Sequence, residues 1–214
     1  MIDARVMTIV RDGDDYIYPC MKVVAPHVST VSILIDSRSG DQTKEVVREL
    51  AREFQNIEWA VYPVENPAQD LVRMRNHQLD FTEEWGLLVD SDEYHYRIAD
   101  YRLGERTAYA FQCHAPWNDE FGHKASARAF IGRLFRNSPM LEWRGSFGKE
   151  KLYDGDTLVF ENAPLMPYRY IHFTHLKKDD WRAEMNQERV ADGRDLYPLP
   201  KDVIYEIKQI HEKV

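Results

Sequence analysis

The stretch Trp85–Val89 contains no charged side chain, and Asp90, Asp92 and Glu93 follow it directly. A strand that is apolar on both faces is typical of the middle of a parallel sheet that helices cover on each side. Carboxylates at close range repel each other, and taking them out of water costs further free energy. We therefore expect a central parallel strand that ends at a site where these charges are neutralised. A divalent cation is the usual partner.

Apolar periodicity predicts the same layout for the first half of the chain. The predicted strands are Arg5–Val10, Thr30–Ile35, Ile57–Tyr62 and Trp85–Val89, and the predicted helices are Tyr16–Ala25, Asp41–Phe54 with Asp41 as N-cap, and Pro67 to about Glu84. This alternation predicts an α/β fold with a Rossmann-like, mostly parallel central sheet flanked by helices. Ligands bind beyond the carboxyl ends of such strands, so Arg11, Asp36 and Asp90 are expected in one crevice.

The second half is less regular. The predicted strands are Thr107–Cys113, Ile131–Arg136, Glu142–Gly148, Leu158–Phe160 and Arg169–Phe173, and the predicted helices are Asp179–Ala191 and Asp202–His211. The sequence has no internal repeat and no low-complexity linker. We expect a single domain over residues 1–214, in which residues 1–95 handle a nucleotide and residues 96–214 shape the other substrate.

Composition excludes some classes of function. The chain has 214 residues, is 43% hydrophobic and carries a formal net charge of -8, which disfavours indiscriminate binding to nucleic acid or acidic membranes but allows a local basic pocket. No uncharged run is long enough to span a bilayer. Cys20 and Cys113 form no metal or redox motif, so a cytoplasmic location is expected.

Three segments carry candidate chemistry. Asp90 and Asp92 can hold Mg²⁺ or Mn²⁺ together with substrate phosphates, although a solvated acidic loop gives the same pattern. Asp36 opens the run DSRSGDQT and can accept hydrogen bonds from a base or a ribose, or it can belong to a helix-capping loop. Arg75, in VRMRNH, suits diphosphate oxygens, whereas Arg73 fits a solvated basic face.

Together these segments resemble the family 2 glycosyltransferases, which have the GT-A fold. DSRSGDQT is similar to that family's acidic D-S-G-S-T-D-G-T type run, Arg75–Asn76 to its arginine-asparagine pair, and LLVDSDE to its D-x-D-E strand end. The resemblance covers roughly residues 5 to 95. Arg38 and Gln42 replace the usual glycines of the turn, and RDGDD replaces the N-E pair usual after the first strand.

The resemblance implies a metal-dependent glycosyltransferase that uses Mn²⁺ or Mg²⁺ and a nucleotide-sugar donor. Asp36 would bind the nucleoside, and Asp90 and Asp92 would hold the metal on the diphosphate, with Asp92 as the direct ligand. A late histidine of YIHFTHLKK, His172 or His175, would complete the metal shell, although a structural histidine is the alternative. The other residues expected at the donor are Arg11, Ser37, Arg75, Asn76, Ser91 and Lys177.

An inverting transfer needs a carboxylate as general base. GRLFRNSPMLEWRGSFGKE resembles a family segment of the form R-x-F-R followed by G-x-x-H-E, which points to Glu150, with Lys149 in the histidine's place. Asp119 and Glu120, in the loop HAPWNDEFGHK, are the second choice, and a surface loop without a catalytic role is their alternative.

Three other functions compete. A haloacid-dehalogenase-type phosphatase also has Asp-x-Asp after an apolar strand, with the first Asp as nucleophile. A nucleotidyltransferase of similar fold is the second, and a nucleotide-sugar binding module without catalysis is the third. The acceptor is open among saccharide, lipid-linked sugar, protein, metabolite and nucleobase.

Overall fold

The computed structural model describes residues 1–13, 16–95, 98–101, 103–118, 124–146 and 149–172. The chain divides into two compact units. The first comprises Met1–Gln112 with Phe130–Tyr170, and the second comprises Cys113–Ala129 with Ile171–Val214. The helices predicted beyond residue 178 lie outside the described residues, and the single-domain layout stays a prediction. Asp36, Arg75, Asp90, Arg133 and Glu150 all belong to the first unit.

The described helices are α1 (Ile17–Val24), α2 (Asp41–Glu53) and α3 (Pro67–His77), with 3₁₀ turns η1 (Ala25–His27) and η2 (Ile98–Asp100). The described strands are β1 (Ile2–Val10), β2 (Val28–Asp36), β3 (Ile57–Tyr62), β4 (Trp85–Leu88), β5 (Glu93–Tyr94), β6 (Ala108–Asn118), β7 (Lys124–Arg136), β8 (Leu141–Arg144), β9 (Lys151–Asp154), β10 (Thr157–Leu158) and β11 (Leu165–His172). The main sheet has the order β3-β2-β1-β4-β7-β6-β11-β5, and β10-β9-β8 form a smaller sheet.

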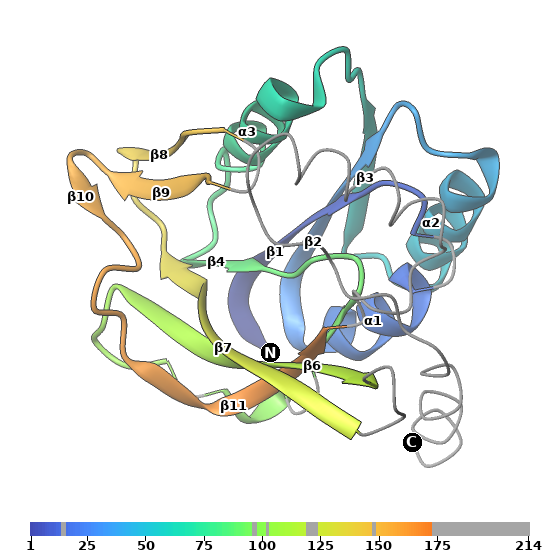
Figure 1. The fold of residues 1–214 in the computed structure, drawn as a ribbon. Coiled ribbons are helices and arrows are strands. Elements are labelled where there is room, and N and C mark those ends of the chain that lie inside the picture. Colours follow the sequence, from blue (N-terminus) through green and yellow to red (C-terminus); the bar gives the residue numbers. More distant parts are fainter. Residues whose placement is uncertain (14–15, 96–97, 102, 119–123, 147–148, 173–214) are drawn as a thin grey trace. The chain divides into compact units, whose positions relative to one another are not determined.

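The first four strands of the main sheet are parallel (Figure 1). Strand β7 then joins β4 in the antiparallel direction. The predicted α/β class with a mostly parallel central sheet is therefore confirmed, and all four residues of β4 are buried as expected for a central strand. Gly86 is required there, because a Cβ at this position would lie 2.4 Å from Cζ of Phe135 on β7.

Hydrogen bonds hold the loops at the carboxyl edge of the parallel strands together. Thr8 of β1 donates its hydroxyl to the carbonyl of Val89 at 2.8 Å. Asp12 accepts a hydrogen bond from the backbone N–H of Gly40 at 3.0 Å, and its own N–H donates to Ser39 at 3.3 Å. The loops that follow β1, β2 and β4 therefore meet at one edge of the sheet, where ligands bind in this class of fold.

Two helix boundaries differ from the prediction. Helix α3 ends at His77 and does not run on to Glu84. The N–H of Gln78 still donates to the carbonyl of Met74, whereas that of Leu79 donates to Asn76 in a tighter turn, and the Gln78 side chain donates to the carbonyls of Thr8 and Ser32 at 3.1 and 3.0 Å. Helix α2 has Gly40 as its N-cap, so Asp41 is its first residue, where a carboxylate favours the positive end of the helix dipole.

The second-half strands also differ in length from the prediction. Strands β6, β7 and β11 are longer than expected, whereas β10 has only two residues. Strand β8 ends at Arg144 because Gly145 has a φ of 113°, a left-handed conformation that breaks an extended strand.

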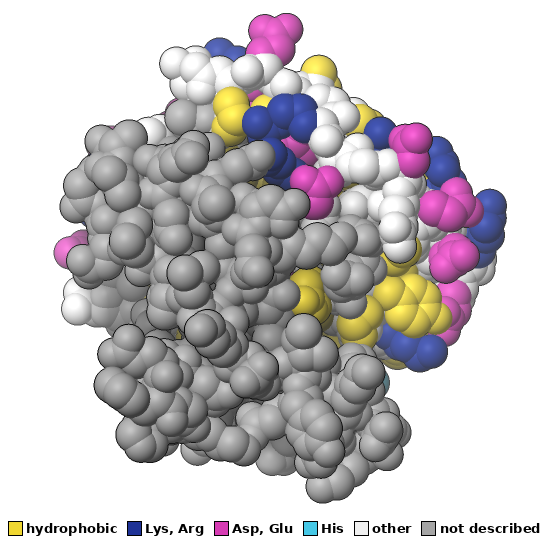
Figure 2. All heavy atoms as spheres, turned by 45° about the vertical axis from the view of Figure 1, so that its right-hand side comes forward, with side chains coloured by type: hydrophobic (Ala, Val, Ile, Leu, Met, Phe, Trp, Pro, Cys, Tyr) yellow, Lys and Arg dark blue, Asp and Glu magenta, His cyan; other side chains and the backbone are white. Residues whose placement is uncertain are grey.

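Charges of both signs are mixed over the described surface. On the face drawn in Figure 2, basic and acidic side chains are interspersed. On α2, Glu45 pairs with Arg48 at 2.8 Å and with Arg52 at 3.6 Å. This face therefore carries no continuous basic field among the residues described. Within the same residues, no helix is both long enough and apolar enough to cross a membrane.

Candidate functional site

Asp90, which follows β4, is bound by two arginines. Its Oδ1 accepts a hydrogen bond from Nη2 of Arg75 on α3 at 3.0 Å, and its Oδ2 accepts one from Nη2 of Arg133 on β7 at 3.0 Å. Both guanidiniums are buried, whereas the Asp90 side chain is 30% exposed. Arginine therefore neutralises part of the acidic cluster that the sequence places here.

Arg133 also pairs with Glu93, whose side chain is fully buried. Burial alone would lower the pKa of Arg133, but the carboxylates of Glu93 and Asp90 raise it well above its ordinary value. Glu93 additionally accepts a hydrogen bond from the backbone N–H of Asp90 at 3.1 Å. These contacts fix the turn after β4 and keep the Arg133 guanidinium charged.

A buried histidine lies behind this ion pair. His95 is 3.4 Å from Glu93 through Nε2 and 3.2 Å from the hydroxyl of Tyr101 through Nδ1. Its ring stacks on Tyr170 with centroids 4.7 Å apart and planes 6° apart. Burial is the main reason that the pKa of His95 is lowered, so a neutral imidazole is favoured at neutral pH.

Asp36, at the end of β2, is also buried and bound by an arginine. Its Oδ1 accepts hydrogen bonds from the backbone N–H and from Nε of Arg38, at 2.9 and 3.0 Å. Burial alone would raise the pKa of Asp36, but hydrogen bonds and charge from Arg38, with a contribution from Arg11, lower it. The side chain is an ionised acceptor at the sheet edge where we expect the nucleoside.

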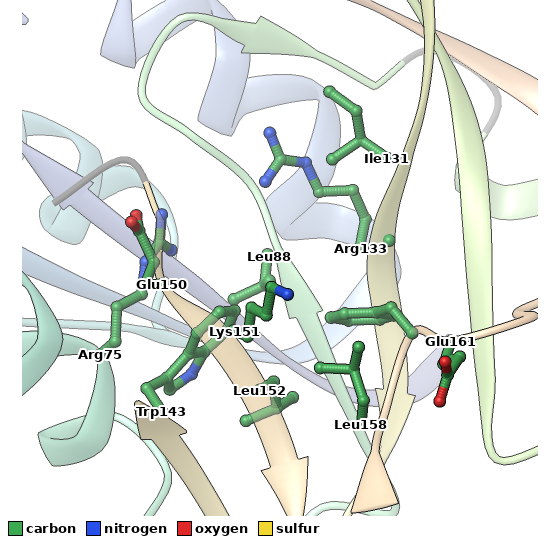
Figure 3. Close-up of a pocket in the computed structure, with 12 residues that line it drawn as sticks. Arg75, Leu88, Ile131, Arg133, Trp143, Glu150, Lys151, Leu152, Leu158 and Glu161 are labelled. Atoms are coloured by element: carbon green, nitrogen blue, oxygen red, sulfur yellow. The ribbon is translucent and has the colours of Figure 1, made fainter. Parts of the chain in front are cut away.

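A cavity of about 390 Å³ adjoins the carboxylate cluster. It is lined mainly by apolar side chains, namely Leu88, Ile131, Trp143, Leu152, Leu158 and Phe160. Arg75, Arg133 and Glu150 supply polar groups to the same wall; Figure 3 shows Arg75 and Arg133 approaching it from different elements. The two arginines that bind Asp90 therefore also face a space of ligand size.

Several polar atoms of this cavity wall are buried without a hydrogen-bond partner among the described residues. They are Nε and Nη1 of Arg75, Nε of Arg133 and Oε2 of Glu150. Leaving a buried donor or acceptor unsatisfied costs about 1–3 kcal/mol, and more when it is charged. A ligand that bonds to these atoms would recover that free energy.

Several residues predicted at the donor make structural contacts. Asn76 bonds in both directions to the backbone of Trp143, at 2.9 and 2.7 Å, and thereby holds β8 against α3. Ser37 accepts a hydrogen bond from the N–H of Val64 at 3.0 Å. Ser91 is buried against Gly13, where an added Cβ would lie 3.3 Å from the serine Oγ. These three side chains shape the loops around the site.

The remaining predicted residues lie in different parts of the chain. Arg11 follows β1 and lies 3.7 Å from Asp12. Asp92 is only 2% exposed. His172 is the last residue of β11 and belongs to the second unit. The other predicted residues, Asp119, Glu120, His175 and Lys177, lie outside the described residues.

The oxygen ligands at this edge suit a hard divalent cation. Asp90 and Glu93 each offer a carboxylate oxygen, and the two atoms lie within 4.8 Å of each other. Each ionised carboxylate has about four lone-pair positions, so the arginine contacts to Asp90 leave acceptor capacity. Carboxylate oxygens are preferred by Mg²⁺ and Mn²⁺. Carboxylates therefore fit the predicted metals, although the pair found here is Asp90 with Glu93 and the predicted pair was Asp90 with Asp92.

Two solved structures share part of this fold. One is the mannosyltransferase PcManGT from Pyrobaculum calidifontis in complex with GDP-Man and Mn²⁺, with 18% identity, a TM-score of 0.41, and coverage of 52% of this chain and 35% of that chain. The other is 4-diphosphocytidyl-2C-methyl-D-erythritolsynthase from Anaerococcus prevotii DSM 20548, with 10% identity, a TM-score of 0.43, and coverage of 63% and 70%.

This chain therefore spans about a third of the mannosyltransferase. No protein-family model and no curated protein matches the sequence. Because both TM-scores are below 0.5, the functional conclusion below depends on the residues of this chain and their contacts.

Sequence reasoning missed Arg133 and the fully buried His95, and it named Glu93 only as a member of the acidic cluster. One signal was present, because Arg133 stands inside the otherwise uncharged segment Phe130–Phe135. A charged residue in such a strand is seldom buried unless it is paired. The partner was hidden because Glu93 is 40 positions away in the chain.

Proposed function

We propose that this chain is a metal-dependent glycosyltransferase that moves a sugar from a nucleotide-sugar donor to an acceptor hydroxyl with inversion. One observation carries the proposal. The buried Glu150 oxygen without a partner among the described residues lines the same cavity as the two arginines that bind Asp90. A candidate general base and a candidate diphosphate site therefore belong to one continuous site.

The donor would lie along the carboxyl edge of β1, β2 and β4. Asp36 is the proposed acceptor for hydrogen bonds from the nucleoside, and its lowered pKa keeps it ionised for this role. Arg11 follows the neighbouring strand, and its charge acts on Asp36. Arg75 would add positive charge near the diphosphate through its contact with Asp90.

Asp90 and Asp92 are the proposed metal ligands, and His172 is the proposed histidine of the shell. Bound Mn²⁺ or Mg²⁺ would supply Lewis-acid stabilisation of the departing diphosphate. Arg75 and Arg133 would hold Asp90 in place while this charge develops.

Glu150 would take the proton of the acceptor hydroxyl. Its Oε2 is buried and has no hydrogen-bond partner among the described residues, so the side chain would lose no hydrogen bond at this oxygen when it turns toward the acceptor hydroxyl. Bond formation from that hydroxyl to the sugar on the face opposite the diphosphate inverts the anomeric centre. The proton ends on Glu150 and the electron pair of the broken bond ends on the diphosphate.

The test is a thermal-shift panel of nucleoside diphosphates and nucleotide sugars, each with and without Mn²⁺. The proposal expects a rise in melting temperature for one nucleotide that is larger when Mn²⁺ is present, since a ligand that binds the folded state stabilises it. If no nucleotide gives a rise under either condition, the proposal fails. We propose a cytoplasmic location for this activity, because Cys20 and Cys113 form no metal or redox motif in the sequence.

A further inference from the structure

The cavity beside Arg75 and Arg133 has a distinctive balance of polar groups. Three buried guanidinium nitrogens without a partner among the described residues belong to its lining arginines, against one such carboxylate oxygen, that of Glu150. The nitrogens can only donate hydrogen bonds, whereas the carboxylate can only accept them when ionised. A complementary ligand is therefore rich in acceptor oxygens and also carries at least one hydroxyl.

The charges of the cavity wall distinguish anionic from neutral ligands. Arg75 and Arg133 each use one nitrogen, Nη2, on the carboxylates of Asp90 and Glu93, and the unpartnered nitrogens are different atoms of the same guanidiniums. Lys151 and Glu161 also line the cavity; both are exposed and their charges are opposite, so the buried arginine nitrogens distinguish between ligands. The guanidinium is charged with either kind of acceptor, but an anionic oxygen adds the Coulomb attraction between two full charges, which is larger in a partly buried site than in water. An anionic group on the ligand is therefore favoured over a neutral one.

The rest of the wall is apolar. Leu88, Leu158 and Phe160 contribute to it, and Trp143 lies with its ring 5.7 Å from the Arg75 guanidinium. A volume of about 390 Å³ lies in the range of small-molecule sites and accommodates a ring of monosaccharide size. Apolar walls with a few charged groups would bury the carbon face of such a ring and fix its orientation (Figure 3).

We propose that this cavity binds a small hydroxylated anion, a sugar or polyol that carries a carboxylate or a phosphate. The anionic oxygens accept hydrogen bonds from Arg75 and Arg133, and a hydroxyl donates to Oε2 of Glu150. That this ligand is the acceptor of sugar transfer rests on the proposed function, because Glu150 is its proposed base. The binding itself does not depend on that activity.

Calorimetric titration of the whole protein tests the proposal, with glucose, glucuronate and glucose 6-phosphate as probes. Metal ion and nucleotide are left out, so a failure here is distinct from a failure of donor binding. We expect glucuronate, glucose 6-phosphate or both to bind at least about tenfold more tightly than glucose, and the better of the two identifies the anionic group. Equal or tighter binding of glucose, or no binding of any probe, overturns the proposal.

A cavity-filling variant locates the bound probe. Leu158→Phe adds a ring to the cavity wall without changing any charge, and it should weaken binding of the anionic probe at least about tenfold. The matched control is Leu165→Phe on β11, at an exposed residue that does not line the cavity. Unchanged binding in a folded Leu158→Phe variant contradicts the proposal. The comparison of probes on the parent protein decides it if that variant does not fold.

Discussion

The guanidinium of Arg133 lies 3.0 Å from the carboxylate of Asp90 and joins strand β7 to the turn after β4. The same Nη2 contacts Glu93, so one buried cation serves two acidic side chains. Asp90 also binds Arg75. The acidic cluster is thus tolerated in the folded protein through two arginines that are distant in the sequence, and any metal ion would add to this network.

Replacing Arg133 with Met should destabilise the protein strongly. Glu93 is fully buried, and removing one partner of a buried ion pair leaves an uncompensated charge, at a cost of about 3–5 kcal/mol. Urea denaturation measures this change. The control is Arg48→Met, which breaks an exposed pair with Glu45 and should change stability little. If Arg133→Met lowers the free energy of unfolding no more than Arg48→Met does, the Arg133 ion pairs do not stabilise the fold.

Asp92→Asn should remove the metal-dependent stabilisation. In the parent, Mn²⁺ with a nucleoside diphosphate should add about 2.7 kcal/mol when the ligand is at a hundredfold its dissociation constant. The variant keeps the size of the side chain and loses the charge that a cation needs, so transfer should also stop. Melting temperatures with and without Mn²⁺ and nucleotide measure the effect. A solvated acidic loop gives no Mn²⁺ effect in either protein.

Asp90→Asn separates the phosphatase from the glycosyltransferase. A phosphatase would use Asp90 as its nucleophile and form a phosphorylated aspartate, which mass spectrometry can detect after trapping. In the proposed glycosyltransferase, Asp90 is a metal ligand instead and forms no covalent bond to phosphorus. We expect no phosphorylated intermediate in the parent protein. Its detection would replace the glycosyltransferase proposal.

Glu150→Gln should lower transfer while nucleotide binding stays near that of the parent. Loss of a general base typically costs about 10²–10⁴-fold in rate, and Gln keeps nearly the same shape. The measurements are the initial rate of sugar transfer and nucleotide affinity by calorimetry. If the variant transfers sugar at the parent rate, the base is Asp119 or Glu120, or the reaction retains configuration.

Stability should fall with decreasing pH through His95. Its pKa is lowered in the folded protein, chiefly by burial, so the unfolded chain takes up a proton at a higher pH than the folded one does. The contribution of His95 to the free energy of unfolding is complete above about pH 6.5. It is lost as the pH falls toward the pKa of the folded state, at up to about 1.4 kcal/mol per pH unit. Urea denaturation over this range should give a shallower pH slope for His95→Gln. Equal pH slopes of the unfolding free energy in the parent and the variant would contradict a lowered pKa of His95.

Gly86→Ala should destabilise the centre of the sheet. The added Cβ would lie 2.4 Å from the ring of Phe135, and overpacking of this kind costs about 1–3 kcal/mol. Phe135→Leu removes the ring that causes the clash, so the double variant should be more stable than the sum of the two single changes predicts. Chemical denaturation of the parent and the three variants gives the coupling. Additive losses would mean that the ring does not limit position 86.

Local patterns in the sequence determined the first half of the fold and the position of the acidic turn. The uncharged residues Trp85–Leu88 form the buried central strand. Strands β2 and β4 both pair with β1 in the parallel direction, so Asp36 and Asp90, which stand at their carboxyl ends, lie at the same edge of the sheet. These features depend on residues close together in the chain, where periodicity and burial act directly. Metal binding, the role of Asp92 and the catalytic base remain predictions.

Tertiary structure decided which charges meet. Asp90 pairs with Arg133 across 43 positions of sequence, and Asn76 holds the backbone of Trp143 across 67 positions. A sequence pattern describes local spacing, whereas burial of a charge depends on a partner that only the folded sheet brings near.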